Sequence, residues 1–174
     1  AVGSKALYDF IDDNPICCCA PVDYVNNVHT ISEIDNFISI NSCIGLDLFG
    51  QVCSESAGYR QVSGTGGQLD FVQGAFASKN GQRFMCTHST RRDSNGKLHS
   101  LIHPVLPAGS IVTTPRAAVN YVVTEFGAVN LKGKSTWQRA EMLISIAHPD
   151  FREDLIREAE KMGIWRNTSK IEYL

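Results

Sequence analysis

The period of the hydrophobic pattern changes near residue 131, and this change limits the fold more than any other feature of the chain. Before it lie short apolar or alternating runs that predict β-strands, at 37–41, 46–49, 52–53, 83–87, 98–102, 111–113 and 121–124, with one helix expected at 68–78. Several runs are apolar throughout, which is typical of strands covered on both faces of a sheet. The fold class that we expect is therefore α/β, with an open sheet.

After residue 131 the apolar residues recur at helical spacing, which predicts two helices. Ser135 and Gln138 have the spacing of a capping box at the start of the first helix, which we expect to end at Pro149. Asp150 is expected to cap the second helix, and Gly163 stands where a helix C-terminus favours a left-handed residue. Two consecutive amphipathic helices need a sheet against which their apolar faces can pack.

Composition excludes some classes of partner. The chain has 174 residues, of which 43% are hydrophobic, so it can bury a core as one domain. Its net charge of −2 gives no electrostatic reason to bind nucleic acid or an anionic membrane. No apolar run approaches the roughly 18 residues of a membrane span.

The six cysteines predict free thiols rather than a disulfide framework or a metal centre. Cys17, Cys18 and Cys19 are consecutive, and neighbouring side chains rarely reach disulfide geometry. No second cysteine pair or close histidine completes a set of four metal ligands, so no metal site is expected. We expect buried or partly buried thiols in a reducing, cytoplasmic compartment.

The standard catalytic motifs are absent. A dinucleotide-binding fingerprint needs glycine where the chain has Leu69, and no P-loop or Gly-x-Ser-x-Gly elbow occurs. Ser94 and Lys97 match a Ser-x-x-Lys pattern, but the intervening Asn-Gly predicts a turn rather than a catalytic helix.

A glycine-rich loop is the first candidate for chemistry. Gly64, Gly66 and Gly67 precede Gln68 and the predicted helix, which leaves backbone N–H groups unobstructed. Such a loop suits an anion or a developing oxyanion. A tight strand-to-helix turn is the alternative.

Two polar residues are further candidates. Glu125 directly follows an apolar strand, where a carboxylate lines the crevice at the carboxyl end of a sheet. Asn27 lies between two apolar segments and offers an amide donor to a substrate carbonyl. The alternatives are a solvated strand end for Glu125 and a turn residue for Asn27.

Ordered blocks of sequence along nearly the whole chain carry a resemblance to a known family. They are GSKALYDFIDDNP, PVDYVNN, SINSCIGLDLFGQVCSES, SGTGGQLDFVQGAFAS, VTTPRAAVNYVVTEFGAVNLKGKS and RAEMLISIAHPDFREDL. The chain resembles the C-terminal part of the acetyl-CoA hydrolase/transferase family, and within it the 4-hydroxybutyrate and butyrate CoA-transferases. The resemblance implies an open α/β sheet of the CoA-transferase type with C-terminal helices.

The resemblance implies an acyl-CoA:carboxylate CoA-transferase that works through a glutamyl-CoA thioester. Backbone N–H groups of Gly66 and Gly67 and the amide of Asn27 would contact the reacting carbonyl or carboxylate. Coenzyme A and acyl-CoA would be substrates, with no covalently bound cofactor, and small carboxylates would be the acceptors.

The resemblance also implies substrate contacts from Glu125, Gly64 and Gln68, and contacts of Lys97 with the phosphates of CoA. In the family, the nucleophilic glutamate precedes the GSKALYDF block by a few tens of residues. We therefore expect residues 1–174 to be the C-terminal domain of a longer chain, inactive alone, whose partners are its own N-terminal part and further copies in a homo-oligomer. Two alternatives stay open: an acyl-CoA hydrolase of the same family, and a non-catalytic binding or assembly module.

Overall fold

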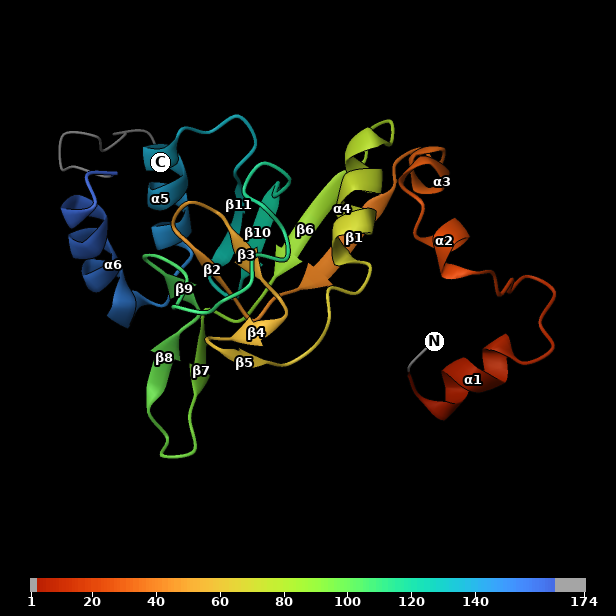
Figure 1. Cartoon of the computed structure of the whole chain (residues 1–174), viewed down its shortest axis with the longest axis horizontal. Coiled ribbons are helices and arrows are strands. Elements are labelled where there is room, and N and C mark those ends of the chain that lie inside the picture. The colour runs from red at the N-terminus through yellow and green to blue at the C-terminus, as the bar shows by residue number, and fades with distance from the viewer. Residues whose placement is uncertain (1–2, 165–174) are drawn as a thin grey trace.

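A four-stranded mixed sheet forms the frame of the fold. The computed structural model describes residues 3–164, and its largest sheet has the strand order β1 (Ile38–Ser42), β6 (Gln82–Cys86), β10 (Tyr121–Thr124) and β11 (Gly127–Asn130). β1, β6 and β10 run parallel, and β11 returns antiparallel beside β10 (Figure 1). The carboxyl ends of three strands therefore meet at one edge.

A second, smaller sheet packs near this edge. Its order is β3 (Val52–Cys53), β2 (Gly45–Asp47) and β9 (Ile102–His103). Two hairpins extend from it, one formed by β4 (Ser56–Ala57) and β5 (Arg60–Gln61), the other by β7 (Thr90–Arg92) and β8 (Leu98–Ser100). The β7–β8 hairpin projects from the body of the molecule (Figure 1).

Six helices occur in the described part of the chain: α1 (Lys5–Ile11), α2 (Val22–Val25), α3 (Val28–Ser32), α4 (Gln68–Ala77), α5 (Thr136–Ser145) and α6 (Pro149–Lys161). The predicted helix at 68–78 is confirmed as α4, and the predicted capping box at Ser135 and Gln138 is confirmed at the start of α5. None of these helices is long and apolar enough to cross a membrane.

The junction between α5 and α6 differs from the prediction. Pro149 does not end the first helix but begins the second, because a proline needs no hydrogen-bond acceptor in a first helical turn. His148 caps α6 through Nδ1, which accepts from the backbone of Asp150 at 3.3 Å, so the expected cap at Asp150 is wrong. Gly163 ends α6 with φ +68, as predicted.

The hydrophobic core lies on one face of the large sheet. Met85 and Val122 point into it and pack with residues of α4, α5 and the second sheet. On the opposite face Ile38 and Ile40 are 57% and 70% exposed. β1 therefore alternates between a packed and an open side, which confirms the alternation predicted for 37–41.

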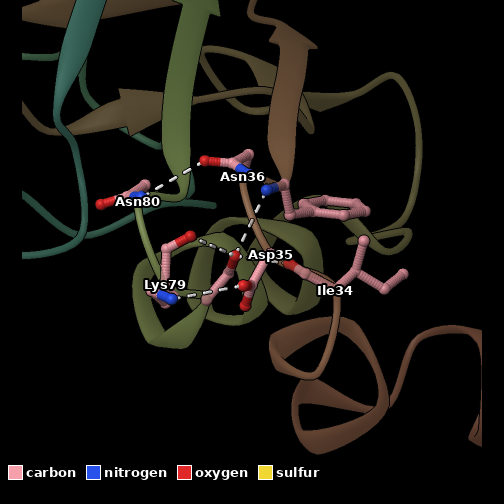
Figure 2. Close-up of polar contacts among 7 residues, drawn as sticks. Ile34, Asp35, Asn36, Lys79 and Asn80 are labelled. Atoms are coloured by element: carbon pink, nitrogen blue, oxygen red, sulfur yellow. Dashed lines mark hydrogen bonds and ion pairs between the residues drawn. The ribbon is translucent and has the colours of Figure 1, made fainter.

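Two turns at the amino ends of β1 and β6 hold these strands in register (Figure 2). Ser78 Oγ donates to the carbonyl of Ile34 at 2.6 Å, and the Asn36 N–H donates to the carbonyl of Lys79 at 2.8 Å. Asn80 Nδ2 donates to Asn36 Oδ1 at 3.3 Å, and both asparagines have left-handed backbone angles. This clamp fixes the pairing of β1 with β6, and with it the alignment of their carboxyl ends.

Two predicted strands differ from the structure. Segment 111–113 forms no strand, since its backbone reaches β3 only through Val52, and Thr114 makes a single bridge there. The run 98–102 is divided between β8 and β9 at Leu101. Strand β11 is absent from the prediction because its sequence, Gly-Ala-Val-Asn, carries little strand propensity.

Residues 3–25 stand apart from the core, and none of the described residues before Ile31 is buried. Helix α1 lies away from the rest of the molecule (Figure 1). All six cysteines are free, as predicted, but Cys18 and Cys19 are exposed, so the expectation that every thiol is at least partly buried is wrong for these two.

Candidate active site

The carboxyl ends of β1, β6 and β10 surround a cavity of about 650 Å³, called here the Glu125 cavity. Ser42 ends β1 and Cys43 follows it, Thr87 and His88 follow β6, and Glu125 follows β10. Ligands in open α/β sheets bind at this edge, because loops from neighbouring strands converge there. The predicted position of Glu125 at the carboxyl end of a buried strand is confirmed.

The carboxylate of Glu125 is held by one residue, Ser89, from the segment that connects β6 and β7. Ser89 donates its Oγ hydrogen to Oε1 at 2.6 Å and its backbone N–H to Oε2 at 2.8 Å. Burial acts to raise the pKa of Glu125, but the hydrogen bonds from Ser89 and the nearby His88 outweigh it, so the pKa lies below the ordinary value. The carboxylate is therefore ionised and oriented at neutral pH.

The two thiols in the Glu125 cavity are uncharged, unlike the carboxylate of Glu125. Burial raises the pKa of Cys43 to about 12, although a hydrogen bond from Thr87 acts to lower it. Burial also raises the pKa of Cys86. A thiol is nucleophilic only as the thiolate. Cys43 and Cys86 therefore line the cavity as protonated, weakly polar groups, and neither is an activated nucleophile.

The glycine loop lies beside this edge. Gly64 and Gly66 are exposed, Gly66 has φ +54, and Gly67 is the N-cap of α4. Within residues 3–164 the backbone N–H groups of Thr65, Gly66 and Gly67 donate to no protein acceptor. Together with the N-terminus of the ten-residue helix α4, these free donors form an environment suited to negative charge.

A chain of hydrogen bonds connects the loop to the Glu125 cavity, although the glycines do not line that cavity. Ser63 Oγ donates to the carbonyl of Ser54 at 3.4 Å, and Ser54 Oγ donates to the carbonyl of Ser42 at 3.4 Å. Ser42 lines the Glu125 cavity. The loop and Glu125 therefore flank one edge of the sheet rather than share one enclosed pocket in the described chain.

The two adjacent asparagines have different positions. Asn27 caps α3, and its Oδ1 accepts from His29 and Thr30 at 2.9 and 3.4 Å. Asn26 lies against the glycine loop, because a Cβ placed on Gly67 would come within 2.2 Å of Asn26 Nδ2. The predicted contact of Asn27 with substrate stays a prediction, and Asn26 is the amide next to the loop.

Gln68 and Lys97 lie apart from Glu125. Gln68 Nε2 donates to Thr114 Oγ1 at 2.9 Å, which ties the first turn of α4 to the segment beside β3. Lys97 lies in the turn of the β7–β8 hairpin and lines a second cavity of about 450 Å³, called here the α6 cleft because α6 forms one wall. Lys97 is not among the residues that surround Glu125.

Sequence reasoning missed Ser89 and Asn26. Ser89 has no motif around it, and only the pairing of β6 with β10 reveals its distance to Glu125. Asn26 could have been found from the sequence, since it belongs to the same Asn-Asn pair as Asn27. Within residues 3–164, no group of three or more His, Cys, Asp or Glu residues is placed to hold a metal ion.

Known proteins match both the sequence and the fold of this chain. A probable butyrate:acetyl-CoA coenzyme A-transferase of Syntrophomonas wolfei subsp. wolfei is 58% identical over 98% of this chain and 38% of that protein. The crystal structure of RipA from Yersinia pestis superimposes with a TM-score of 0.83, at 46% identity, over 93% of this chain and 36% of that one. A 4-hydroxybutyrate CoA-transferase from Porphyromonas gingivalis gives a TM-score of 0.72 at 42% identity, over 92% of this chain and 35% of that one.

The chain thus spans 38% or less of the length of each of these relatives, and its fold corresponds to their C-terminal part. The acetyl-CoA hydrolase/transferase C-terminal domain matches residues 3–159, which is most of the chain. On this match and these identities, the chain belongs to the acetyl-CoA hydrolase/transferase family and carries its C-terminal domain.

Proposed function

We propose that residues 1–174 are the C-terminal domain of an acyl-CoA:carboxylate CoA-transferase of the butyrate, 4-hydroxybutyrate and acetate type. One structural observation carries the proposal: an ionised, oriented carboxylate, Glu125, lies at the carboxyl edge of parallel strands, beside a loop with free backbone N–H donors. The similarity to CoA-transferases of related sequence supports it.

In the proposed reaction the nucleophile is a glutamate carboxylate from the part of the protein upstream of this chain. Its oxygen attacks the acyl-CoA carbonyl, the C–S bond breaks, and CoA leaves as the thiolate from an acyl-glutamyl anhydride. The thiolate then attacks the glutamyl carbonyl and expels the acyl group as a carboxylate, leaving a glutamyl-CoA thioester. An incoming carboxylate reverses both steps and leaves as the new acyl-CoA.

The residues of this chain would act on the charge that forms in these steps. Each addition creates a tetrahedral oxyanion, and the free N–H groups of Gly66 and Gly67 would donate to it, with Gly64, Asn26 and Asn27 nearby. One such donor contributes about 10²–10³ in rate. Glu125 would face the reacting thioester, with its carboxylate held in one orientation by Ser89.

The test is carboxylate-dependent exchange by the complete protein that contains this chain. With butyryl-CoA and acetate as substrates, we expect the complete protein to form acetyl-CoA and butyrate, as measured by chromatography. We expect no turnover by residues 1–174 alone. Glu125→Gln should reduce exchange by at least tenfold, whereas the matched change Glu160→Gln, at an exposed position on α6, should not. Turnover by the isolated chain would contradict the upstream nucleophile.

A hydrolase is the second candidate, because the family name covers both activities. Hydrolysis differs only in that water attacks the thioester. Release of free CoA at the same rate with and without acetate would identify a hydrolase. A complete protein that neither exchanges, hydrolyses nor binds acyl-CoA would instead be a binding or assembly module.

A further inference from the structure

Arg83 is a buried cation that has no partner in the described part of the chain. It belongs to β6 and is 3% exposed, and within residues 3–164 its enclosed Nε and Nη1 atoms make no hydrogen bond. It forms no ion pair there either. Burial lowers the pKa of Arg83 and no acidic group acts against it, yet a guanidinium stays charged at neutral pH. Such a buried charge is strongly unfavourable unless an anion compensates it.

Asn120, the neighbour of Arg83 on the same face of the large sheet, also lacks a partner. The pairing of Tyr121 with Phe84 places the preceding residues, Asn120 and Arg83, beside each other. Tyr121 and Phe84 stack on one face, so the side chains before them point to the opposite face. Asn120 is 7% exposed, and its enclosed Oδ1 accepts no hydrogen bond from the described residues. Two adjacent buried polar side chains are therefore incomplete.

Phe76 and Lys132 form, with Arg83 and Asn120, a group called here the Arg83 cluster. Arg83 Cζ lies 4.5 Å from the centre of the Phe76 ring, and Lys132 Nζ lies 5.6 Å from the same centre. Phe76 is 63% exposed, and Lys132 is an exposed cation without an ion pair in the described chain. The ring attracts both cations but does not neutralise them. Because Nη2 of Arg83 is not among the enclosed atoms, a ligand from solution can reach the guanidinium.

The Arg83 cluster is separate from the proposed active site. Arg83 is the second residue of β6 and pairs with Ser39 in β1, close to the clamp that joins the amino ends of these strands (Figure 2). The Glu125 cavity lies at the carboxyl ends of the same strands. No member of the cluster lines the Glu125 cavity or the α6 cleft.

We propose that the Arg83 cluster binds a tetrahedral divalent oxyanion of the phosphate type, with oxygens facing Arg83 Nη2 and Lys132 Nζ. Two cations without an acidic neighbour favour a dianion over a singly charged carboxylate, and guanidinium groups match the geometry of phosphate oxygens. A half-turn of the Asn120 amide exchanges Oδ1, which repels an anion, for Nδ2, which attracts it. The inference does not depend on the proposed function.

The experiment follows the ³¹P NMR line width of inorganic phosphate in the presence of the complete protein, at an ionic strength kept constant with chloride. Arg83→Met should weaken phosphate binding by at least tenfold, because a charge-assisted hydrogen bond is lost. Lys132→Gln, at an exposed position, should weaken it by about threefold. Acetate, which competes for the same site with one charge, should bind at least threefold more weakly than phosphate.

Lys79→Gln is the matched control. Lys79 is an exposed cation at the same end of the sheet, but it already pairs with Asp35 and does not contact Phe76, so phosphate binding should not change. Phosphate that binds elsewhere, for example at the glycine loop, is bound equally by the wild type and by Arg83→Met. The difference between these two proteins therefore reports the Arg83 cluster alone.

Thermal unfolding of the complete protein gives a second, independent readout. In phosphate-free buffer Arg83→Met should unfold at the same temperature as the wild type or higher, because methionine removes the cost of an uncompensated buried charge. Added phosphate should raise the unfolding temperature of the wild type, since it binds the folded state, and should raise that of Arg83→Met less.

Three results would overturn the inference. The first is equal phosphate binding by the wild type and by both Arg83→Met and Lys132→Gln. The second is lower stability of Arg83→Met in phosphate-free buffer, which would show that another part of the complete protein already neutralises Arg83. The third is acetate binding as tight as phosphate binding, which would contradict a site for a dianion.

Discussion

Ser89 binds both carboxylate oxygens of Glu125, through its hydroxyl at 2.6 Å and its backbone N–H at 2.8 Å. The two residues are 36 positions apart in the sequence and meet because β6 and β10 are parallel neighbours. A carboxylate with both oxygens engaged has a fixed orientation, and its negative charge is stabilised relative to the protonated acid.

This contact predicts a pH effect. Because the folded-state pKa of Glu125 is lowered, its contribution to stability is present above the unfolded-state pKa and is lost as the pH falls through the folded-state value. Ser89→Ala removes the hydroxyl donor and should raise the pKa of Glu125, as followed by ¹³C NMR of the carboxyl group. Ser32→Ala, on the remote helix α3, should leave that titration unchanged, and an equal shift in both variants would contradict the assignment.

Gly67→Ala should separate stability from activity. The new Cβ would come within 2.2 Å of Asn26 Nδ2, which is the far end of a flexible side chain and can move away. The free energy of unfolding should therefore fall by less than about 1 kcal/mol. Acyl exchange by the complete protein should fall by at least tenfold, because the displaced amide and the loop donors no longer face the substrate together.

Gly64→Ala provides the stability control for that variant, because no atom lies within 4 Å of its added Cβ. Its melting temperature should match the wild type. A loss of several kcal/mol in Gly67→Ala would show that the loop is a packing element rather than a site for substrate.

Gly74→Ala tests the contact between α3 and α4. Alanine gains up to about 1 kcal/mol in helix propensity over glycine, but its Cβ would lie 2.5 Å from two carbons of Ile31. Overpacking costs about 1–3 kcal/mol and should outweigh the gain, so denaturant unfolding should show net destabilisation. In an Ile31→Gly background both contacted carbons are absent, and the same Gly74→Ala change should become stabilising.

Ser135→Ala removes the side-chain cap of α5. Ser135 Oγ accepts from the backbone of Gln138, whose side chain in turn accepts from the Ser135 N–H at 3.0 Å. Loss of such a cap costs about 1 kcal/mol. Ser145→Ala at the other end of the same helix should stay within about 0.5 kcal/mol of the wild type in urea unfolding, and equal losses would show that the capping box contributes nothing specific.

Local patterns predicted those elements whose stability depends on nearby residues. The strand at 121–124 matches β10 in full, and α4 matches the predicted 68–78 to within one residue. The capping box at Ser135 follows from two residues three positions apart. Segment 111–113 looked equally strand-like, but among the described residues its backbone-to-backbone bonds reach only Val52. Its other bonds to this region run through the side chains of Ser56 and Thr113, so its propensity alone does not make a strand.

The candidate site shows the same division. The sequence by itself determined that Gly66 and Gly67 precede a helix and that Glu125 follows a buried strand, because hydrophobic period and glycine position are local properties. Only the tertiary structure decided that Ser89 holds Glu125, that Asn26 lies against Gly67, and that Leu101 separates two cavities. Those contacts join residues far apart along the chain, and they depend on strand order and register, which no local pattern encodes.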